Sequence, residues 1–171
     1  MAVEYTLELF PTEGNWDSYV NWLGGTDIQR NNDNAGVDLY TVKGDFVPAG
    51  EKATLLDLGV KARMTKRWQS CQYGNPVERD DTCHFWLAPR SSIWKNGVRQ
   101  ANSLGVIDRS YRGVLMGAVL TNGSNVSIPA GNRLFQVLAP DMGWISRVVL
   151  KPLSELDETA RGEGGFGSTG K

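Results

Sequence analysis

Short apolar runs separated by turn residues dominate the hydrophobic pattern of this chain. Residues 114–120 are almost entirely apolar and lead into Asn122-Gly123, a dipeptide typical of hairpin turns. Similar apolar or alternating stretches occur at residues 5–10, 53–62, 85–88, 133–139 and 146–150, the second of them interrupted by Gly59. Runs this short, ended by Gly, Pro or Asn, are typical of strands. The pattern therefore predicts an all-β sandwich or barrel.

Helical signals are confined to two short segments. One helical turn is expected from Ser91 to Lys95, ended by Asn96-Gly97, and another near residues 18–23. Two polar stretches, at about residues 14–34 and 64–84, interrupt the strand pattern and are interpreted as insertions. From residue 153 onward the chain loses strand character. The expected organisation is one β domain over residues 1–152, followed by a flexible C-terminal arm over residues 153–171.

Composition narrows the class of protein. A chain of 171 residues is long enough for a single domain with its own core. Its net charge of −1 provides no overall field for a nucleic acid polymer or an anionic membrane. No apolar run reaches transmembrane length, and the N-terminus lacks a signal-peptide pattern, so we expect an intracellular, cytoplasmic protein. Cys71, Cys83 and His84 do not have a recognised zinc spacing, and two cysteines are too few for a disulfide framework.

The C-terminal stretch, residues 161–170, is the most informative part of the sequence. Five of its ten residues are glycine, so it cannot form a packed core by itself. Between the glycines lie Arg161, a planar partner for phosphate, Phe166, a ring that can cover a base, and the hydroxyls of Ser168 and Thr169. This combination favours a flap that closes over a nucleotide. The alternative is a disordered tail or an expression scar.

Three internal segments carry further candidate chemistry. Asp38 follows a small, flexible pair and is a candidate to hold a metal ion or its waters, or else it caps a turn. Arg90, Ser91 and Ser92 end one strand and open a helical turn, where backbone N–H groups and hydroxyls favour an anion, or else they form an ordinary helix cap.

Asp108 follows Val106 and Ile107, two β-branched residues, and is therefore expected at the edge of a strand. A carboxylate in that position can accept a proton from water, and Tyr111 could pack its ring against a sugar. The alternative is a tight turn with a capping Asp and a packing Tyr. Arg133 and Gln136 lie three positions apart, which places them on opposite faces of a regular strand, so they need not share a site.

In this order the segments resemble the five motifs of the trimeric dUTPase family. The matching pieces are Ala35-Gly36-Val37-Asp38-Leu39, Pro89-Arg90-Ser91-Ser92 and residues 102–113, 131–136 and 161–170. The resemblance implies a jelly-roll homotrimer that hydrolyses dUTP to dUMP and pyrophosphate with Mg²⁺. It also implies active sites shared between subunits and a tail that crosses to a neighbour. Additions such as residues 64–84 are associated with phage and viral members.

The resemblance also implies a role for each matched residue. Asp108 matches the base that activates water, Gln136 the glutamine beside the phosphates and that water, and Asp38 an indirect ligand of hydrated Mg²⁺. Tyr111 matches the residue that packs under the deoxyribose and excludes a 2′-hydroxyl. The uracil hairpin corresponds to Asn102, Gly105, Val106 and Ile107. The phosphate-binding turn corresponds to Arg90, Ser91 and Ser92. The tail corresponds to Arg161, Gly165, Phe166, Gly167, Ser168 and Thr169.

Some positions depart from the family pattern, and other readings remain open. Ser110 stands where an acidic residue is common, and Val114 where a polar one is common. A dCTP deaminase of the same fold is one alternative, although that family usually has Trp in place of Tyr111 and a glutamate that the strand after Gly113 lacks. A dUTPase-fold binding or signalling module, with a protein partner held by the insertions, is another. A capsid-type jelly roll would leave the five ordered motifs unexplained.

Overall fold

The structure is a computed structural model that describes residues 3–165, and that range is rich in short strands. The N-terminal elements are β1 (Val3–Pro11), α1 (Trp16–Leu23), β2 (Asp27–Gln29), β3 (Val37–Leu39), β4 (Asp45–Val47), β5 (Thr54–Asp57), β6 (Val60–Gln72) and β7 (Asn75–Cys83). The remaining elements are β8 (Phe85–Pro89), η1 (Ile93–Asn96), β9 (Val98–Gln100), β10 (Gly105–Ile107), β11 (Met116–Thr121), β12 (Val126–Ile128), β13 (Phe135–Leu138), β14 (Ile145–Leu150) and η2 (Leu153–Glu155).

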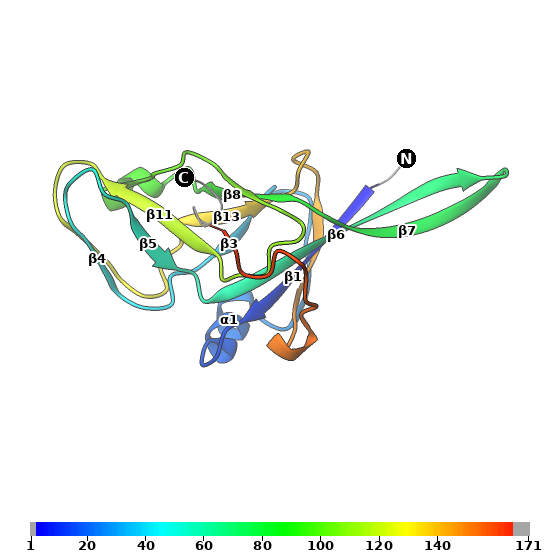
Figure 1. Cartoon of the computed structure of the whole chain (residues 1–171), viewed down its shortest axis with the longest axis horizontal. Coiled ribbons are helices and arrows are strands. Elements are labelled where there is room, and N and C mark those ends of the chain that lie inside the picture. The colour runs from blue at the N-terminus through cyan, green and yellow to red at the C-terminus, as the bar shows by residue number, and fades with distance from the viewer. Residues whose placement is uncertain (1–2, 166–171) are drawn as a thin grey trace.

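Within the described residues the strands form four sheets, and the predicted all-β class is confirmed (Figure 1). The largest has the order β2-β14-β1-β6-β7, and β1 runs parallel to β14 but antiparallel to β6. The others have the orders β10-β8-β13-β3, β5-β11-β9 and β12-β4. Within residues 3–165, no helix has the length and apolar character needed to cross a membrane.

The core lies between these sheets and follows from alternation along the strands. In β6, Val60, Ala62 and Met64 are buried, whereas Lys61 and Arg63 between them are only partly covered. This is the period of two expected for a strand with one face against the core. The helical turn predicted from Ser91 to Lys95 is confirmed as η1, which ends at Asn96 and is followed by Gly97 in a left-handed conformation.

Residues 53–62 form two strands rather than the single strand that the sequence predicts. Gly59 has a φ of +64°, and a Cβ there would lie 2.3 Å from Val42 Cγ1. The backbone therefore turns at this position, and β5 and β6 enter different sheets.

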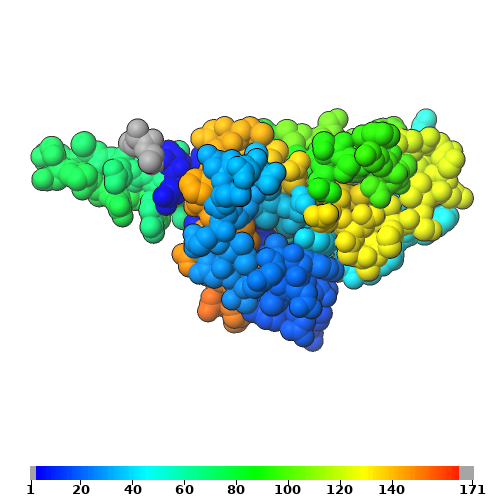
Figure 2. Space-filling model, turned by 180° about the vertical axis from the view of Figure 1, so that it is seen from behind, coloured from blue at the N-terminus to red at the C-terminus, as the bar shows by residue number. Residues whose placement is uncertain are grey.

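Both interpreted insertions have regular structure. Residues 14–34 contain α1 and β2, and Tyr19 of α1 is fully buried and donates a hydrogen bond of 2.5 Å to Leu58 O. Residues 64–84 form most of the β6–β7 hairpin, which pairs with β1 as far as Trp68, and the part beyond stands clear of the body in both views (Figures 1 and 2). Its turn uses Tyr73 and Gly74, both with positive φ, as a two-residue hairpin requires.

Candidate functional site

Two hollows contain most of the predicted site residues, and none of the described residues lines both. We call them the narrow pocket, of about 140 Å³, and the polar hollow, of about 600 Å³. The narrow pocket is lined by Leu87, Gln100, Asn102, Gly105, Val106, Ile107, Asp108, Tyr111, Met116, Arg161 and Gly165.

The narrow pocket forms where β10 lies against β8. Gly105 pairs with Leu87, and a Cβ on Gly105 would lie 3.1 Å from Leu87 O, so the close approach of the two strands favours glycine. β10 is the outer strand of its sheet, and Asp108 follows it directly. The expected position of Asp108 at a strand edge is therefore confirmed.

The Asp108 carboxylate lies between two nitrogen-bearing groups. Its Oδ2 contacts the guanidinium of Arg161, and its Oδ1 lies 3.4 Å from His84 Nδ1. The backbone N–H of Arg109 donates to the same His84 nitrogen at 3.1 Å, which requires an unprotonated Nδ1. The side chain of Asp108 is 38% exposed, so a water molecule can reach the carboxylate.

Tyr111 forms the buried back of the narrow pocket. Its hydroxyl donates to Val114 O at 2.9 Å, and burial raises the pKa of the phenol. Gly165 of the C-terminal arm lies against the ring, since a Cβ on this glycine would be 2.7 Å from Tyr111 Cε2. Only a residue without a side chain allows the arm to approach the ring so closely.

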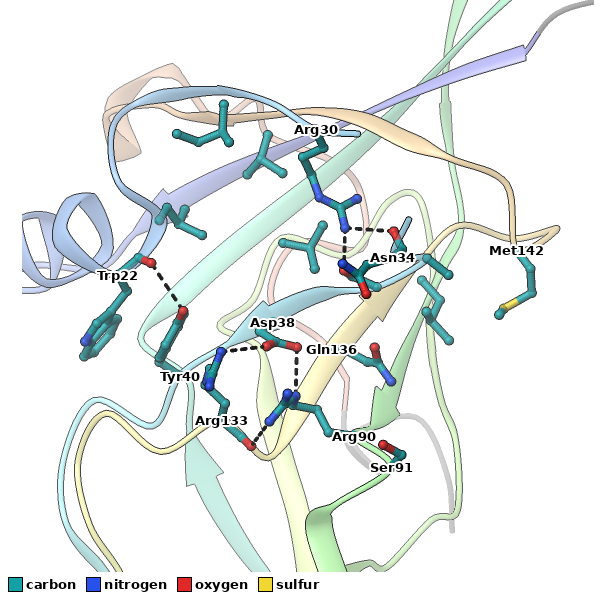
Figure 3. A pocket seen from close by; sticks show the side chains of 17 residues that line it. Trp22, Arg30, Asn34, Asp38, Tyr40, Arg90, Ser91, Arg133, Gln136 and Met142 are labelled. Carbon is teal, nitrogen blue, oxygen red and sulfur yellow. Dashed lines mark hydrogen bonds and ion pairs between the residues drawn. The ribbon is translucent and has the colours of Figure 1, made fainter. Parts of the chain in front are cut away.

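The polar hollow gathers candidate anion-binding residues around Asp38 (Figure 3). Asp38 Oδ1 lies 3.0 Å from Arg90 Nε, and its Oδ2 lies 3.5 Å from an Arg133 nitrogen. Gln136 pairs with Asp38 across β13 and β3 and donates to Pro89 O at 3.2 Å. Ser91, which follows Arg90, completes this group of polar side chains.

Arg133 and Gln136 both line the polar hollow, so the expectation that they lie on opposite faces of a strand is wrong. The period of two applies only within a strand, and β13 begins at Phe135. Arg133 lies in the preceding loop, which leaves its side chain able to turn toward Asp38.

The insertion of residues 14–34 supplies one wall of the polar hollow. Arg30 donates to Ile145 O at 2.8 Å, to Asn34 O at 3.0 Å and to Gly36 O at 2.6 Å, and burial lowers the pKa of its guanidinium. Trp22 stacks on Tyr40 with ring centroids 4.5 Å apart. By binding the carbonyls of Asn34 and Gly36, the Arg30 guanidinium holds the loop that precedes Asp38 in place.

Sequence reasoning did not identify Trp22, Arg30 or Gln100 as site residues. Gln100 is buried, and its amide donates to Leu87 O at 3.1 Å. Among residues 3–165, no atom hydrogen-bonds to its Oε1. All three residues lie outside the matched motifs. Their positions in the sequence form no recognisable pattern, because only the packing of distant segments brings them to the hollows.

The predicted residues fall into four groups by position. Asn102, Gly105, Val106, Ile107, Asp108, Tyr111, Arg161 and Gly165 line the narrow pocket. Asp38, Arg90, Ser91 and Gln136 line the polar hollow. Ser92 precedes η1 and lines neither. Phe166, Gly167, Ser168 and Thr169 lie outside the described residues.

Asp38 is the candidate metal-holding residue, and its surroundings limit how an ion could bind. Residues 3–165 contain no group of three or more His, Cys, Asp or Glu side chains arranged to hold a metal. Asp38 is already paired with Arg90 and Arg133. These residues therefore fit an ion that arrives with phosphate and water ligands better than one enclosed by protein carboxylates.

Comparisons with known proteins identify the family. A dUTPase family model matches residues 27–170. The chain is 34% identical to the deoxyuridine 5′-triphosphate nucleotidohydrolase of Escherichia phage T5, covering 81% of this chain and 86% of that one. It is 32% identical to the Rickettsia typhi protein of the same name, covering 88% and 91%.

A solved structure of a mutant dUTPase from Staphylococcus bacteriophage 80alpha, with dUpNHpp, has a TM-score of 0.52 at 13% identity and covers 90% of this chain and 96% of that one. At this identity the likeness supports the fold alone, whereas the family model and the two relatives extend over most of the sequence. The chain belongs to the dUTPase family.

Proposed function

We propose that this protein hydrolyses dUTP to dUMP and pyrophosphate. The observation that carries the proposal is the narrow pocket, in which a partly exposed carboxylate, Asp108, lies beside the buried ring of Tyr111 and a strand edge at Gly105. The relatives from phage T5 and Rickettsia typhi are named for this reaction.

In the proposed mechanism, Asp108 accepts a proton from a water molecule as that water attacks the α-phosphorus in line and pyrophosphate leaves. Arg161 contacts the same carboxylate in this structure. A γ-phosphate of the substrate would attract the guanidinium and free Asp108 to act as the base. Gln136, held by Pro89 O, is proposed to contact the phosphates and the attacking water.

Selectivity is proposed to come from the narrow pocket. The backbone of residues 105–107 and the side chain of Asn102 would read the edge of uracil, because a site built from hydrogen bonds strongly rejects bases that leave its groups unpaired. The buried Tyr111 ring would leave no room for a 2′-hydroxyl. Tyr111→Ala should therefore raise the relative rate with UTP, and unchanged discrimination against UTP would move this role elsewhere.

We further propose that the working protein is a homotrimer. The groups suited to the nucleoside line one hollow, and most of those suited to the phosphates line another; within residues 3–165 the two hollows share no lining residue. Association of three chains would bring the polar hollow of one subunit to the narrow pocket of the next. Mg²⁺ is the proposed cofactor; when bound, it would neutralise charge on the triphosphate, with Asp38 holding its waters.

The deciding experiment measures pyrophosphate release from dUTP, dTTP, dCTP and UTP with Mg²⁺. We expect turnover of dUTP alone, and Asp108→Asn should lower kcat by about 10²-fold or more while nucleotide binding remains. Ammonia released from dCTP would instead indicate a deaminase. Binding of dUTP without turnover would indicate a signalling module.

A further inference from the structure

The only histidine of the chain lies beside the proposed base. His84 is the single residue between β7, which ends at Cys83, and β8, which begins at Phe85 (Figure 1). β8 and β10 are antiparallel, and Ile107 pairs with Phe85, so one further step along each strand leads to His84 and Asp108. The side chains do meet there, with His84 Nδ1 at 3.4 Å from Asp108 Oδ1. The register of two paired strands therefore sets this contact.

The neutral imidazole holds the turn that carries Asp108. The N–H of Arg109 donates to His84 Nδ1 at 3.1 Å, and Arg109 O accepts from the guanidinium of Arg112 at 2.8 Å. The N–H of Tyr111 donates to Asp108 O at 3.0 Å and closes the turn. Both backbone polar groups of Arg109 are thus held by side chains, and the histidine supplies the contact from the β8 side.

Protonation would exchange the partner of this nitrogen. A neutral Nδ1 with a free lone pair accepts from Arg109, whereas in a charged imidazole both ring nitrogens are donors. The charged ring repels the Arg109 N–H and attracts the Asp108 carboxylate. Hydrogen bonds between such charged groups are about 2.7–2.9 Å long, so the ring and the carboxylate would approach by about 0.5 Å. His84 Nδ1 can therefore serve the turn or the carboxylate, but not both.

The titratable groups nearby leave this exchange in place. The other oxygen of the carboxylate, Oδ2, contacts Arg161. Cys83 stays neutral, because burial raises the pKa of its thiol to about 11. Asp81 of β7 accepts a hydrogen bond of 2.7 Å from an indole and lines a separate hollow with Arg109. Within residues 3–165, His84 forms its ion pair with Asp108 alone, and its side chain is 60% exposed, so it exchanges protons with solvent.

We propose that His84 is a positioning residue for Asp108. In its neutral form it holds the turn that carries the carboxylate, and in its protonated form it pairs with that carboxylate and keeps it from accepting the proton of water. This inference rests on the proposed function and adds a residue that lies outside the five matched motifs. Because histidine changes charge between about pH 5 and 8, activity should fall at a pH where an ordinary aspartate is still ionised.

The single histidine makes the contact observable by NMR without any measurement of activity. In protein labelled with ¹⁵N-histidine, the ring shifts report the tautomer and the charge of His84 alone, and the backbone amide of Arg109 reports the hydrogen bond. At about pH 8.5 we expect a neutral ring protonated on Nε2, and an Arg109 amide that shifts together with the imidazole as pH falls. A neutral ring protonated on Nδ1, or an Arg109 amide that does not follow the imidazole, would overturn the proposal.

Two substitutions separate the charge of His84 from its hydrogen bond. His84→Asn offers an oxygen that can accept from Arg109 but takes up no proton, whereas His84→Ala removes the acceptor. For each protein, kcat/KM for dUTP is measured across pH relative to its own value at about pH 8.5. One unit below the pH at which the imidazole is half charged, the wild-type value should be about 10-fold lower, and that of His84→Asn less than about 2-fold lower. His84→Ala should have a lower kcat at every pH, which asparagine restores in part.

The outcomes distinguish this inference from the proposed function. If wild-type protein and His84→Asn lose activity in parallel as pH falls, His84 does not control the base, although dUTP hydrolysis stands. If the wild-type protein releases no pyrophosphate from dUTP at any pH, the proposed function fails and the catalytic role of His84 fails with it. The NMR titration would then still decide whether protonation of His84 releases the Arg109 amide.

Discussion

A methyl group added at Gly36 should slow dUTP hydrolysis without unfolding the protein. An alanine Cβ there would lie 1.9 Å from Gln136 Oε1 and 2.8 Å from Gln136 Cδ. Both atoms belong to the end of a flexible side chain, so the amide can swing away, and Gln136 Cβ, at 3.2 Å, needs to shift by only a few tenths of an ångström while β3 and β13 stay paired. The movement breaks the hydrogen bond from Gln136 Nε2 to Pro89 O, which is 3.2 Å long.

The two consequences differ in size. Loss of one partly buried hydrogen bond costs about 0.5–1.5 kcal/mol. Replacing glycine with alanine returns about 0.4–1 kcal/mol by restricting the unfolded chain. The melting temperature should therefore move by no more than about 4 °C. A catalytic contact displaced by about 1 Å can cost about 10²-fold in rate, so we expect kcat for dUTP to fall by about 10- to 100-fold.

Gly44→Ala is the matched control, because its Cβ would meet nothing closer than Ile128 O at 3.8 Å. Steady-state hydrolysis and thermal unfolding of both variants are compared with the parent protein. Wild-type kcat in Gly36→Ala would show that Gln136 need not be held where the structure places it. A large loss of stability would show that the backbone, and not the amide, gives way.

Two further predictions concern stability. Gly117→Ala should destabilise the protein by about 1–3 kcal/mol in urea unfolding, because its Cβ would lie 2.1 Å from the fully buried ring of Phe135; an unchanged midpoint would refute this packing. Burial raises the pKa of Glu8, but the hydrogen bonds from Arg63 and Lys151 together lower it by more than burial raises it. The pKa of Glu8 in the folded protein therefore lies below its value in the unfolded chain. Its stabilising effect should be complete above about pH 5 and disappear as pH falls through the folded pKa; Glu8→Gln should flatten that acid limb of stability.

Strands that pack against the core were predictable, because burial on one face imposes a period on the sequence. The β6–β7 hairpin beyond Met64 and Cys83 was not, since residues 65–82 lie outside the core cluster. Trp68 donates to Asp81 at 2.7 Å, and Arg67 pairs with Asp80 at 2.9 Å, so polar cross-strand contacts replace apolar alternation. A polar segment of this kind has the composition of a loop.

The sequence predicted which candidate residues lie together where a motif keeps them close in sequence. Asp108 and Tyr111 both line the narrow pocket, because both lie in the loop that follows the end of β10. Arg30 and Gln100 reach the hollows only through tertiary packing, and Arg133 was misplaced because the start of β13 could not be located from the sequence. The spacing of residues in a motif indicates which side chains are candidates for a site. Where each strand begins and ends decides which of those side chains lie close together.

Strand β8 borders both hollows, and this has a consequence for the proposed trimer. Leu87 O accepts from Gln100 at the narrow pocket, and Pro89 O accepts from Gln136 at the polar hollow. The side chains of Gln100 and Gln136 are thus held by backbone carbonyls of the same strand. The two hollows therefore keep their shape, although most of their chemical groups lie on loops. In a threefold assembly each chain would lend its narrow pocket to one active site and its polar hollow to another. A distortion of β8 in one subunit would therefore damage two active sites, whereas loss of Asp108 would damage one.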